Sequence, residues 1–258
     1  MKFGGRLELI KSDLIGQPSV DEAGLGTYVR HPPADDAEPH LSKRSKPKIG
    51  NSHLMPNPAR HALSLIRRHR AEFIAVNAAF FGLFAATMTV TLLNPEIQPA
   101  ILDAISGIVR TDLAVNVYLS GNLFHAASAT FAVNLGIAVM LISIPSFLVP
   151  FFGVVFAMVF AAAYGVTLAP IGPYAAAMIP HSITVLIEFQ AYIVAAFGAY
   201  LTGRITLLPV AGEKRSIGQR YKTAAAHVLS LYALVVPLLL LGAVYEAFEI
   251  IYLVGYFI

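Results

Sequence analysis

Residues 122–168 read NLFHAASATFAVNLGIAVMLISIPSFLVPFFGVVFAMVFAAAYGVTL, and they lie within a longer stretch, from Thr111 to Gly203, that contains no Lys or Arg. Over all 258 residues, 57% are hydrophobic and 13% are charged, about half the charged fraction of a soluble domain. A water-soluble fold of this size could not expose so uncharged a surface. The sequence therefore predicts an all-α, polytopic bundle of transmembrane helices.

Five apolar segments predict about five membrane spans. A span needs roughly 20 apolar residues, because a helix rises about 1.5 Å per residue and the hydrocarbon core is about 30 Å thick. Proline-rich turns at Pro145–Pro150 and Pro170–Pro173 separate three of them, and the last part of the chain, Tyr245–Ile258, is expected to bend onto the surface. The predicted spans are residues 73–93, 122–144, 151–168, 174–201 and 224–243, within a membrane domain of residues 57–258.

Two segments have the pattern of amphipathic helices that lie at a membrane surface. The first begins at Asn57-Pro58, with Asn as the cap and Pro at the first helical position, and is expected to run straight into the first span. Its basic face would meet anionic headgroups. The second, residues 97–108, is expected to lie flat on the outer surface. In the first helix, Leu63, Leu65 and Ile66 oppose Arg60, Arg67, Arg68 and Arg70.

Residues 1–56 are polar and contain six prolines. Such a segment cannot bury enough apolar area to offset its ordering entropy, so it is predicted to be a disordered tail. It contains no clean apolar core of a secretory signal, and the first span is expected to direct membrane insertion.

The distribution of Lys and Arg predicts the orientation in the bacterial inner membrane. Twelve of the 18 basic residues precede the first span, and five lie in residues 202–223. With five spans, both regions fall on the same side, so the N-terminus is predicted to be cytoplasmic and the C-terminus to lie outside. This charge needs no nucleic-acid partner. Arg204, Lys214, Arg215 and Arg220 are candidates for contact with a cytosolic partner.

Ionisable residues inside a bilayer are costly and are therefore candidates for function. His181 and Glu188 are seven residues apart, which places them on one helix face about 10.5 Å apart, too far to pair directly. A path for protons, ions or substrate, lined by these two and His125, is one hypothesis; a buried polar clamp between helices is the favoured one. The intramembrane candidates are His181, Glu188, His125, Asn122, Asn134 and Glu246.

Several chemistries are excluded or not indicated. The chain has no Cys, so disulfides, thiolate metal sites and Cys nucleophiles are excluded. It has no phosphate-binding Gly-rich loop, no HExxH and no GxSxG motif, so neither an enzyme nor a cofactor or metal site is predicted. Runs of Ala such as Ala161–Ala163 permit close helix packing, expected mainly within the chain, and leave homo-oligomerisation open.

From about Tyr118 onward, the chain resembles the stage II sporulation protein M family of membrane proteins. The stretch Tyr118–Asn122 is similar to a motif that opens a span in that family, and Tyr164–Leu168 is similar to its Asn-Gly-x-x-Leu segment. Pro180-His181, Glu188–Ala191 and Glu246–Phe248 follow in the same order. The family usually has Gly after the His and Glu four residues past it, whereas here Ser182 follows and Glu188 lies seven residues past.

The resemblance implies a non-enzymatic membrane component, since in sporulating bacteria the family anchors a cell-wall hydrolase complex. The leading hypothesis is a scaffold subunit that positions other membrane or cytosolic proteins. The alternative is a permease-like transport subunit of an ABC-type exporter, which would require a separate ATPase because this chain has no nucleotide site. An intramembrane enzyme using His181 and Glu188 is a third, least favoured hypothesis.

Overall fold

The structure is a computed structural model, and it describes residues 57–106, 116–172, 175–208 and 215–257. Within these ranges the chain forms helices and no strand. The predicted disordered tail, residues 1–56, lies outside the described residues, as do Arg110 and Lys214.

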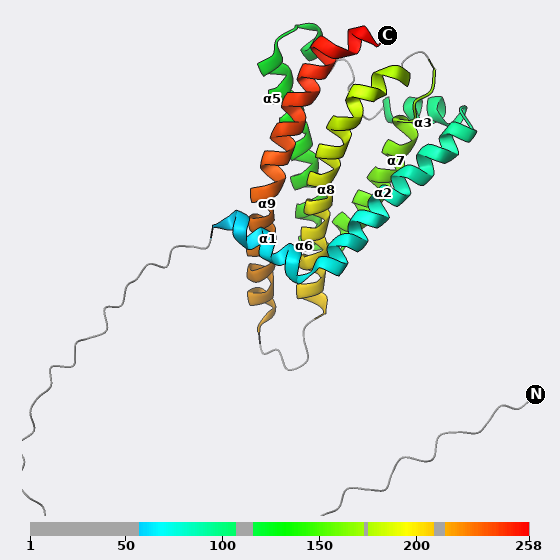
Figure 1. Ribbon diagram of the computed structural model, residues 1–258. Coiled ribbons are helices and arrows are strands. Elements are labelled where there is room, and N and C mark those ends of the chain that lie inside the picture. The colour runs from blue at the N-terminus through cyan, green and yellow to red at the C-terminus, as the bar shows by residue number, and fades with distance from the viewer. Residues whose placement is uncertain (1–56, 107–115, 173–174, 209–214, 258) are drawn as a thin grey trace, which may run out of the picture. The chain divides into compact units, whose positions relative to one another are not determined.

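The described elements follow one another along the chain as helices joined by short turns (Figure 1). Two π-helical segments, η1 and η3, continue α-helices, and two short 3₁₀ turns, η2 and η4, flank others. The bounds are α1 Pro58–Arg68, α2 Arg70–Leu93, α3 Ile97–Ser106, α5 Leu123–Gly136, η1 Ile137–Ser143, α6 Ile144–Leu148, α7 Phe152–Thr167, η2 Ala175–Ala177, α8 Met178–Leu207, α9 Ile217–Phe248, η3 Glu249–Leu253 and η4 Val254–Tyr256.

Four helical segments in the described part are long and apolar enough to cross a membrane: Arg70–Leu93, Leu123–Leu148, Ala175–Leu207 and Ile217–Tyr256. They correspond to four of the five predicted spans. The remaining one corresponds to α7, an apolar helix of 16 residues. Its rise of about 24 Å is less than the thickness of the hydrocarbon core.

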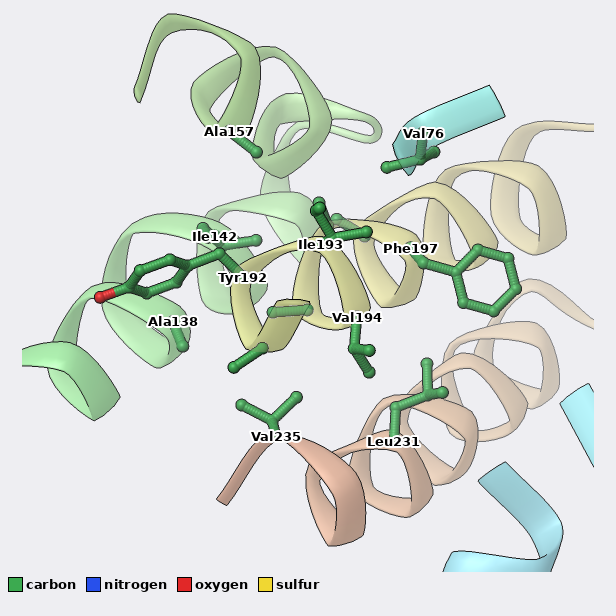
Figure 2. Packing of buried hydrophobic residues seen from close by; sticks show 14 of the residues in the cluster. Val76, Ala138, Ile142, Ala157, Tyr192, Ile193, Val194, Phe197, Leu231 and Val235 are labelled. Atoms are coloured by element: carbon green, nitrogen blue, oxygen red, sulfur yellow. The ribbon is translucent and has the colours of Figure 1, made fainter. Parts of the chain in front are cut away.

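Helix α8 lies at the centre of the packing and contacts α2, α7, η1 and α9. Residues 191–199 are all buried, and Figure 2 shows side chains of the neighbouring elements around them. α8 contributes Tyr192, Ile193, Val194 and Phe197 to this core, and its neighbours contribute Val76, Ala138, Ile142, Ala157, Leu231 and Val235.

Small residues on α7 allow close approach to its neighbours within the chain. Gly153, Ala157, Ala161 and Gly165 recur every four residues and are all buried. A Cβ atom at Gly165 would lie 2.0 Å from the Thr87 hydroxyl oxygen of α2, and one at Gly153 would lie 2.2 Å from a backbone oxygen of η1. The stripe therefore serves intramolecular packing, the use expected for such residues.

The expected straight run from the amphipathic helix into the first span is wrong. The helix breaks at His69, whose backbone angles are φ −115° and ψ 39°. Asn57 caps α1 as predicted, accepting a hydrogen bond of 3.0 Å from the Ala59 N–H. Because α1 buries Ala62 and Leu65 and packs against α9, it cannot also continue along the axis of α2.

The predicted turn at Pro145–Pro150 begins four residues too early. The helical run continues through Pro145 to Leu148, and the chain reverses near Phe151, a non-glycine residue at φ 67°. Pro145 has no backbone N–H and cannot donate a hydrogen bond within the helix. The wider π-helical turns of η1 directly precede it, so the helical run accommodates the proline instead of ending there. Gly203 leaves room for the Phe151 ring, since a Cβ there would lie 2.7 Å from it.

The ends of the last two long helices also differ from the prediction. Pro180 does not interrupt its helix, because α8 begins at Met178 and Pro is tolerated in a first turn. The expected surface bend after Tyr245 is not present: α9 reaches Phe248 and continues directly into η3. As a result, Glu249 is fully buried instead of facing the surface.

Candidate functional site

A group of polar side chains meets where the start of α8 lies against the end of α9. It is called here the acidic cluster. It is formed by His181, Thr184 and Glu188 of α8, Glu246 of α9, Glu249 of η3, Asn134 of α5, and Tyr118, which precedes α5. Of the described residues at this end of the bundle, none is Lys or Arg.

Glu249 is the most deeply buried member of the acidic cluster, with no exposed surface. The Thr184 hydroxyl donates a hydrogen bond of 2.9 Å to its Oε2 atom, and its Oε1 atom bonds to Nδ1 of His181. A buried carboxylate is costly unless it is bonded, so using both oxygens offsets part of that cost. These bonds join α8 to η3.

Glu188 links three helices. The side-chain amide of Asn134 on α5 donates a hydrogen bond to its Oε1 atom. On the other side, Gly242 of α9 leaves the space that the Glu188 side chain fills, because a Cβ at Gly242 would lie 2.7 Å from Glu188 Cγ. Glu188 therefore sets how closely α5, α8 and α9 approach one another.

Tyr118 and Glu246 form the edge of the acidic cluster. The hydroxyl groups of Tyr118 and Thr130 share a hydrogen bond, and Tyr118 also interacts with Glu246. Burial, together with the nearby Glu246 carboxylate, raises the pKa of Tyr118. The phenol thus stays protonated at neutral pH and keeps a proton to donate.

The structure brings together four of the six intramembrane candidates: His181, Glu188, Asn134 and Glu246. The other two lie elsewhere. His125 is exposed, and Asn122 caps α5 by accepting a hydrogen bond of 3.0 Å from the His125 backbone N–H. His181 and Glu188 were predicted not to pair directly. In the structure His181 bonds to Glu249 of η3, and Glu188 bonds to Asn134 of α5.

Sequence reasoning missed three members of the acidic cluster: Glu249, Thr184 and Tyr118. Two of them had a signal in the sequence. Glu249 and Thr184 each lie three residues after another cluster member, and residues three apart share a helix face. Tyr118 had no signal of this kind; it stood in the stretch that resembles the family motif, but it was not singled out as an intramembrane candidate.

The acidic cluster lies at one boundary of a layer without charged side chains. Residues 189–203 of α8 and 228–245 of α9 contain no Asp, Glu, Lys, Arg or His. Along α9, the 19 residues from His227 to Glu246 rise about 28 Å, close to the thickness of the hydrocarbon core. Along α8, Glu188 lies about 24 Å from Arg204, so it reaches roughly one helical turn inside this layer.

The polar contacts within this charge-free layer are neutral. Gln190 donates a hydrogen bond of 2.6 Å to Asn77 on α2, and the hydroxyls of Ser143 and Tyr232 lie 2.8 Å apart. The Tyr192 hydroxyl is buried without a hydrogen-bond partner among the described residues. Figure 2 shows it pointing away from Phe197. Residues 189–203 and 228–245 thus place no Asp, Glu, Lys, Arg or His side chain in this layer.

The opposite end of the bundle, called here the basic end, is formed by α1, the end of α8 and the start of α9. There the candidate Arg204 is paired within the chain, with Glu72, and it lies 3.3 Å from Nδ1 of His69. Arg215 is exposed and bonds Thr223 at 3.4 Å, whereas Arg220 is partly buried. Arg204 therefore links α2 to α8 through a partly exposed ion pair, whatever else it contacts.

An apolar pocket of about 330 Å³ lies beside His181. Its walls come from α2, α8 and the segment between α7 and α8, and its polar residues are His181 and Ser182. The acidic cluster can thus be approached from this side through His181. Among the described residues, no group of three or more His, Asp or Glu is placed to hold a metal ion.

No family model, curated protein or solved structure matches this chain. The resemblance to the stage II sporulation protein M family thus rests on the sequence motifs alone. Four residues from those motifs, Tyr118, His181, Glu188 and Glu246, belong to the acidic cluster, although they span more than half of the membrane domain in sequence.

Proposed function

We propose that this chain is a non-enzymatic subunit of the bacterial inner membrane that positions partner proteins. Its five apolar helices, α7 included, cross the bilayer, with the N-terminus and the basic end in the cytoplasm and the C-terminus outside. The distribution of Lys and Arg supports this orientation, because eight of them lie at the described basic end and none at the described acidic end.

The observation that carries the proposal is the closure of the acidic cluster against an uncharged core. Glu188 and Glu249 bond side chains of neighbouring helices, and the layer beneath Glu188 is filled by apolar residues of α8 and α9. Such an arrangement holds helices in register at one membrane boundary. It does not resemble a polar path that continues across the bilayer.

The sequence resemblance supports the same proposal. It covers a little over half of the chain and implies an anchoring role without turnover. Only 11% of the most apolar part of α2 is buried within the chain. The rest of this uncharged surface is available to another membrane protein as well as to lipid.

A second function, that of a permease-like subunit of an exporter, is favoured by one observation. The acidic cluster contains three carboxylates and a single histidine, so its charges do not balance when all are ionised. A proton or a cationic substrate could supply the difference, and the pocket beside His181 gives a route to it.

The test is affinity purification of the full chain in mild detergent, with identification of the proteins that remain bound. The scaffold proposal predicts a stoichiometric membrane or cytosolic partner whose retention does not depend on ATP. Recovery of an ATPase whose turnover is stimulated by this chain would favour the exporter instead. A chain that purifies alone from cross-linked membranes would contradict both.

The Glu188→Gln variant separates the two functions further. Gln keeps the shape of Glu and can still accept a hydrogen bond from Asn134. A scaffold is therefore expected to retain its partners in this variant, as it does in the wild type. Normal assembly with complete loss of transport would overturn the scaffold proposal.

A further inference from the structure

Helix α1 crosses α9 (Figure 1), and both helices carry basic side chains there. The name α1–α9 junction is used here for His61 and Arg68 of α1 together with two residues of α9: His227, and Arg220, which lies seven residues before it on the same helix face. The rings of His61 and His227 lie 5.6 Å apart. Arg68, His69 and Arg215 are also close enough to His227 to interact with it electrostatically.

The basic end lacks the negative charge to balance these groups. Leaving Arg215 aside, its described residues include seven Lys and Arg but a single carboxylate, that of Glu72, and Arg204 pairs with it. Like charges held together by a fold repel each other unless an anion lies between them. An anion from outside the described residues would balance this charge.

Two nitrogen atoms at the α1–α9 junction point to where such an anion would bind. Nε of Arg220 and Nδ1 of His227 are buried, and neither has a hydrogen-bond partner in the part of the chain that the structure describes. Buried polar atoms are rarely left unbonded. A phosphate offers several acceptor oxygens, and it suits the guanidinium group in particular.

The depth of the α1–α9 junction identifies the source of the phosphate. His227 immediately precedes the charge-free residues 228–245, and Glu72 is the last charged residue of α2 before its charge-free residues 73–93. The junction thus lies at the boundary of the hydrocarbon layer, where lipid headgroups are found. α1 is fixed there because Ala62 and Leu65 are buried against the bundle.

We infer that the α1–α9 junction binds the phosphate of an anionic lipid headgroup. His61 and Arg68 share one face of α1, since they are seven residues apart, and this face lies toward α9. Arg60 and Arg67 share a different face of α1, and they are exposed, as Arg68 is. The inference stands on the basic end alone and does not depend on the proposed function at the acidic end.

The experiment is native mass spectrometry of the full chain in mild detergent, with phosphatidylglycerol or phosphatidylcholine added at equal concentration. The wild type is expected to retain phosphatidylglycerol preferentially. The double variant Arg68→Gln/Arg220→Gln removes two contacts, so retention should fall by about tenfold or more. The control, Arg60→Gln/Arg67→Gln, removes the same charge from the other face of α1 and should change retention less than twofold.

Each other outcome overturns the inference. Equal loss in the two double variants would mean general attraction to a basic surface, and equal retention of both lipids would mean no headgroup recognition. Displacement of the lipid by inorganic phosphate at the same concentration would make free phosphate the ligand. A further variant replaces Asp35, Asp36 and Glu38 by neutral residues. If this variant binds the lipid and the wild type does not, the N-terminal segment of the chain occupies the junction. Circular dichroism checks that each variant folds.

Discussion

The two ends of the helix bundle place their ion pairs in opposite surroundings. At the acidic end, Glu249 has no exposed surface and bonds two side chains of α8. At the basic end, the Arg204 and Glu72 side chains pair while 42% and 29% exposed. Water can solvate the separated partners only at the basic end. The same kind of pair therefore contributes to stability at one end and mainly to surface charge at the other.

Replacing Glu249 with Ala is expected to give the largest difference in stability between the acidic end and the basic end. The change leaves His181 and Thr184 without their acceptor, and removing one partner of a buried pair typically costs about 3–5 kcal/mol. The free energy of unfolding, measured by SDS titration in mixed micelles with circular dichroism, should fall by this amount. Glu249→Gln keeps an acceptor oxygen and should lose less. An Ala variant as stable as the wild type would show that the pair does not hold α8 to η3.

A methyl group at Gly242 tests the packing of the acidic cluster. The new Cβ of Gly242→Ala would press on Glu188 Cγ, and overpacking of this kind costs about 1–3 kcal/mol in the same titration. Gly136→Ala is the matched control, because nothing lies within 4 Å of its Cβ position. In a Glu188→Ala background the shortened side chain no longer meets the new Cβ, so Gly242→Ala should lower the free energy of unfolding by less than it does in the wild type. An equal loss in the two backgrounds would mean that the new Cβ does not press on Glu188.

The charge-free layer between the two ends offers a smaller contrast between two tyrosines. Tyr232→Phe removes the hydrogen bond to Ser143 and should destabilise the protein by about 0.5–1.5 kcal/mol. Tyr192→Phe removes a buried hydroxyl that has no partner among the described residues, so its stability should stay equal to or rise above that of the wild type. If Tyr192→Phe lowered the free energy of unfolding more than Tyr232→Phe does, the Tyr192 hydroxyl would have a hydrogen-bond partner.

The smallest effect is expected at the basic end. Arg204→Ala breaks the exposed pair with Glu72, and its unfolding midpoint should stay close to that of the wild type. Any difference measured in low salt should shrink as NaCl is added, because salt screens exposed charges. A large loss of stability in Arg204→Ala that does not depend on salt would show that the ion pair at the basic end stabilises the fold as much as the buried pair at the acidic end.

The sequence was sufficient to predict helices throughout the described residues, four of them long and apolar enough to cross a membrane, and most helix positions. Long stretches without Lys or Arg can be tolerated only in lipid, whatever the tertiary packing. Helix ends were predicted less well, since Pro145 lies inside a helix where π-helical turns precede it. Such turns depend on the contacts of the whole bundle, which local sequence does not specify.

Four of the seven members of the acidic cluster were predicted from the sequence, but the pairs that they form were not. His181, Glu188, Asn134 and Glu246 stood out because polar residues are rare in apolar segments. Their bonds join residues far apart in sequence, such as His181 and Glu249, which are 68 positions apart. Helix packing decides which of them meet. Glu249 was overlooked because a continuous α9 places it in the interior instead of at the surface.

On the proposed function, the acidic cluster closes one end of the bundle and belongs to no path across the membrane. The most direct test of this claim is proton flux in proteoliposomes that contain the purified chain, with an imposed pH gradient and a pH-sensitive dye inside. The account predicts that the wild type and Glu188→Gln leak protons no faster than empty liposomes. Flux through the wild type that disappears in Glu188→Gln would contradict it.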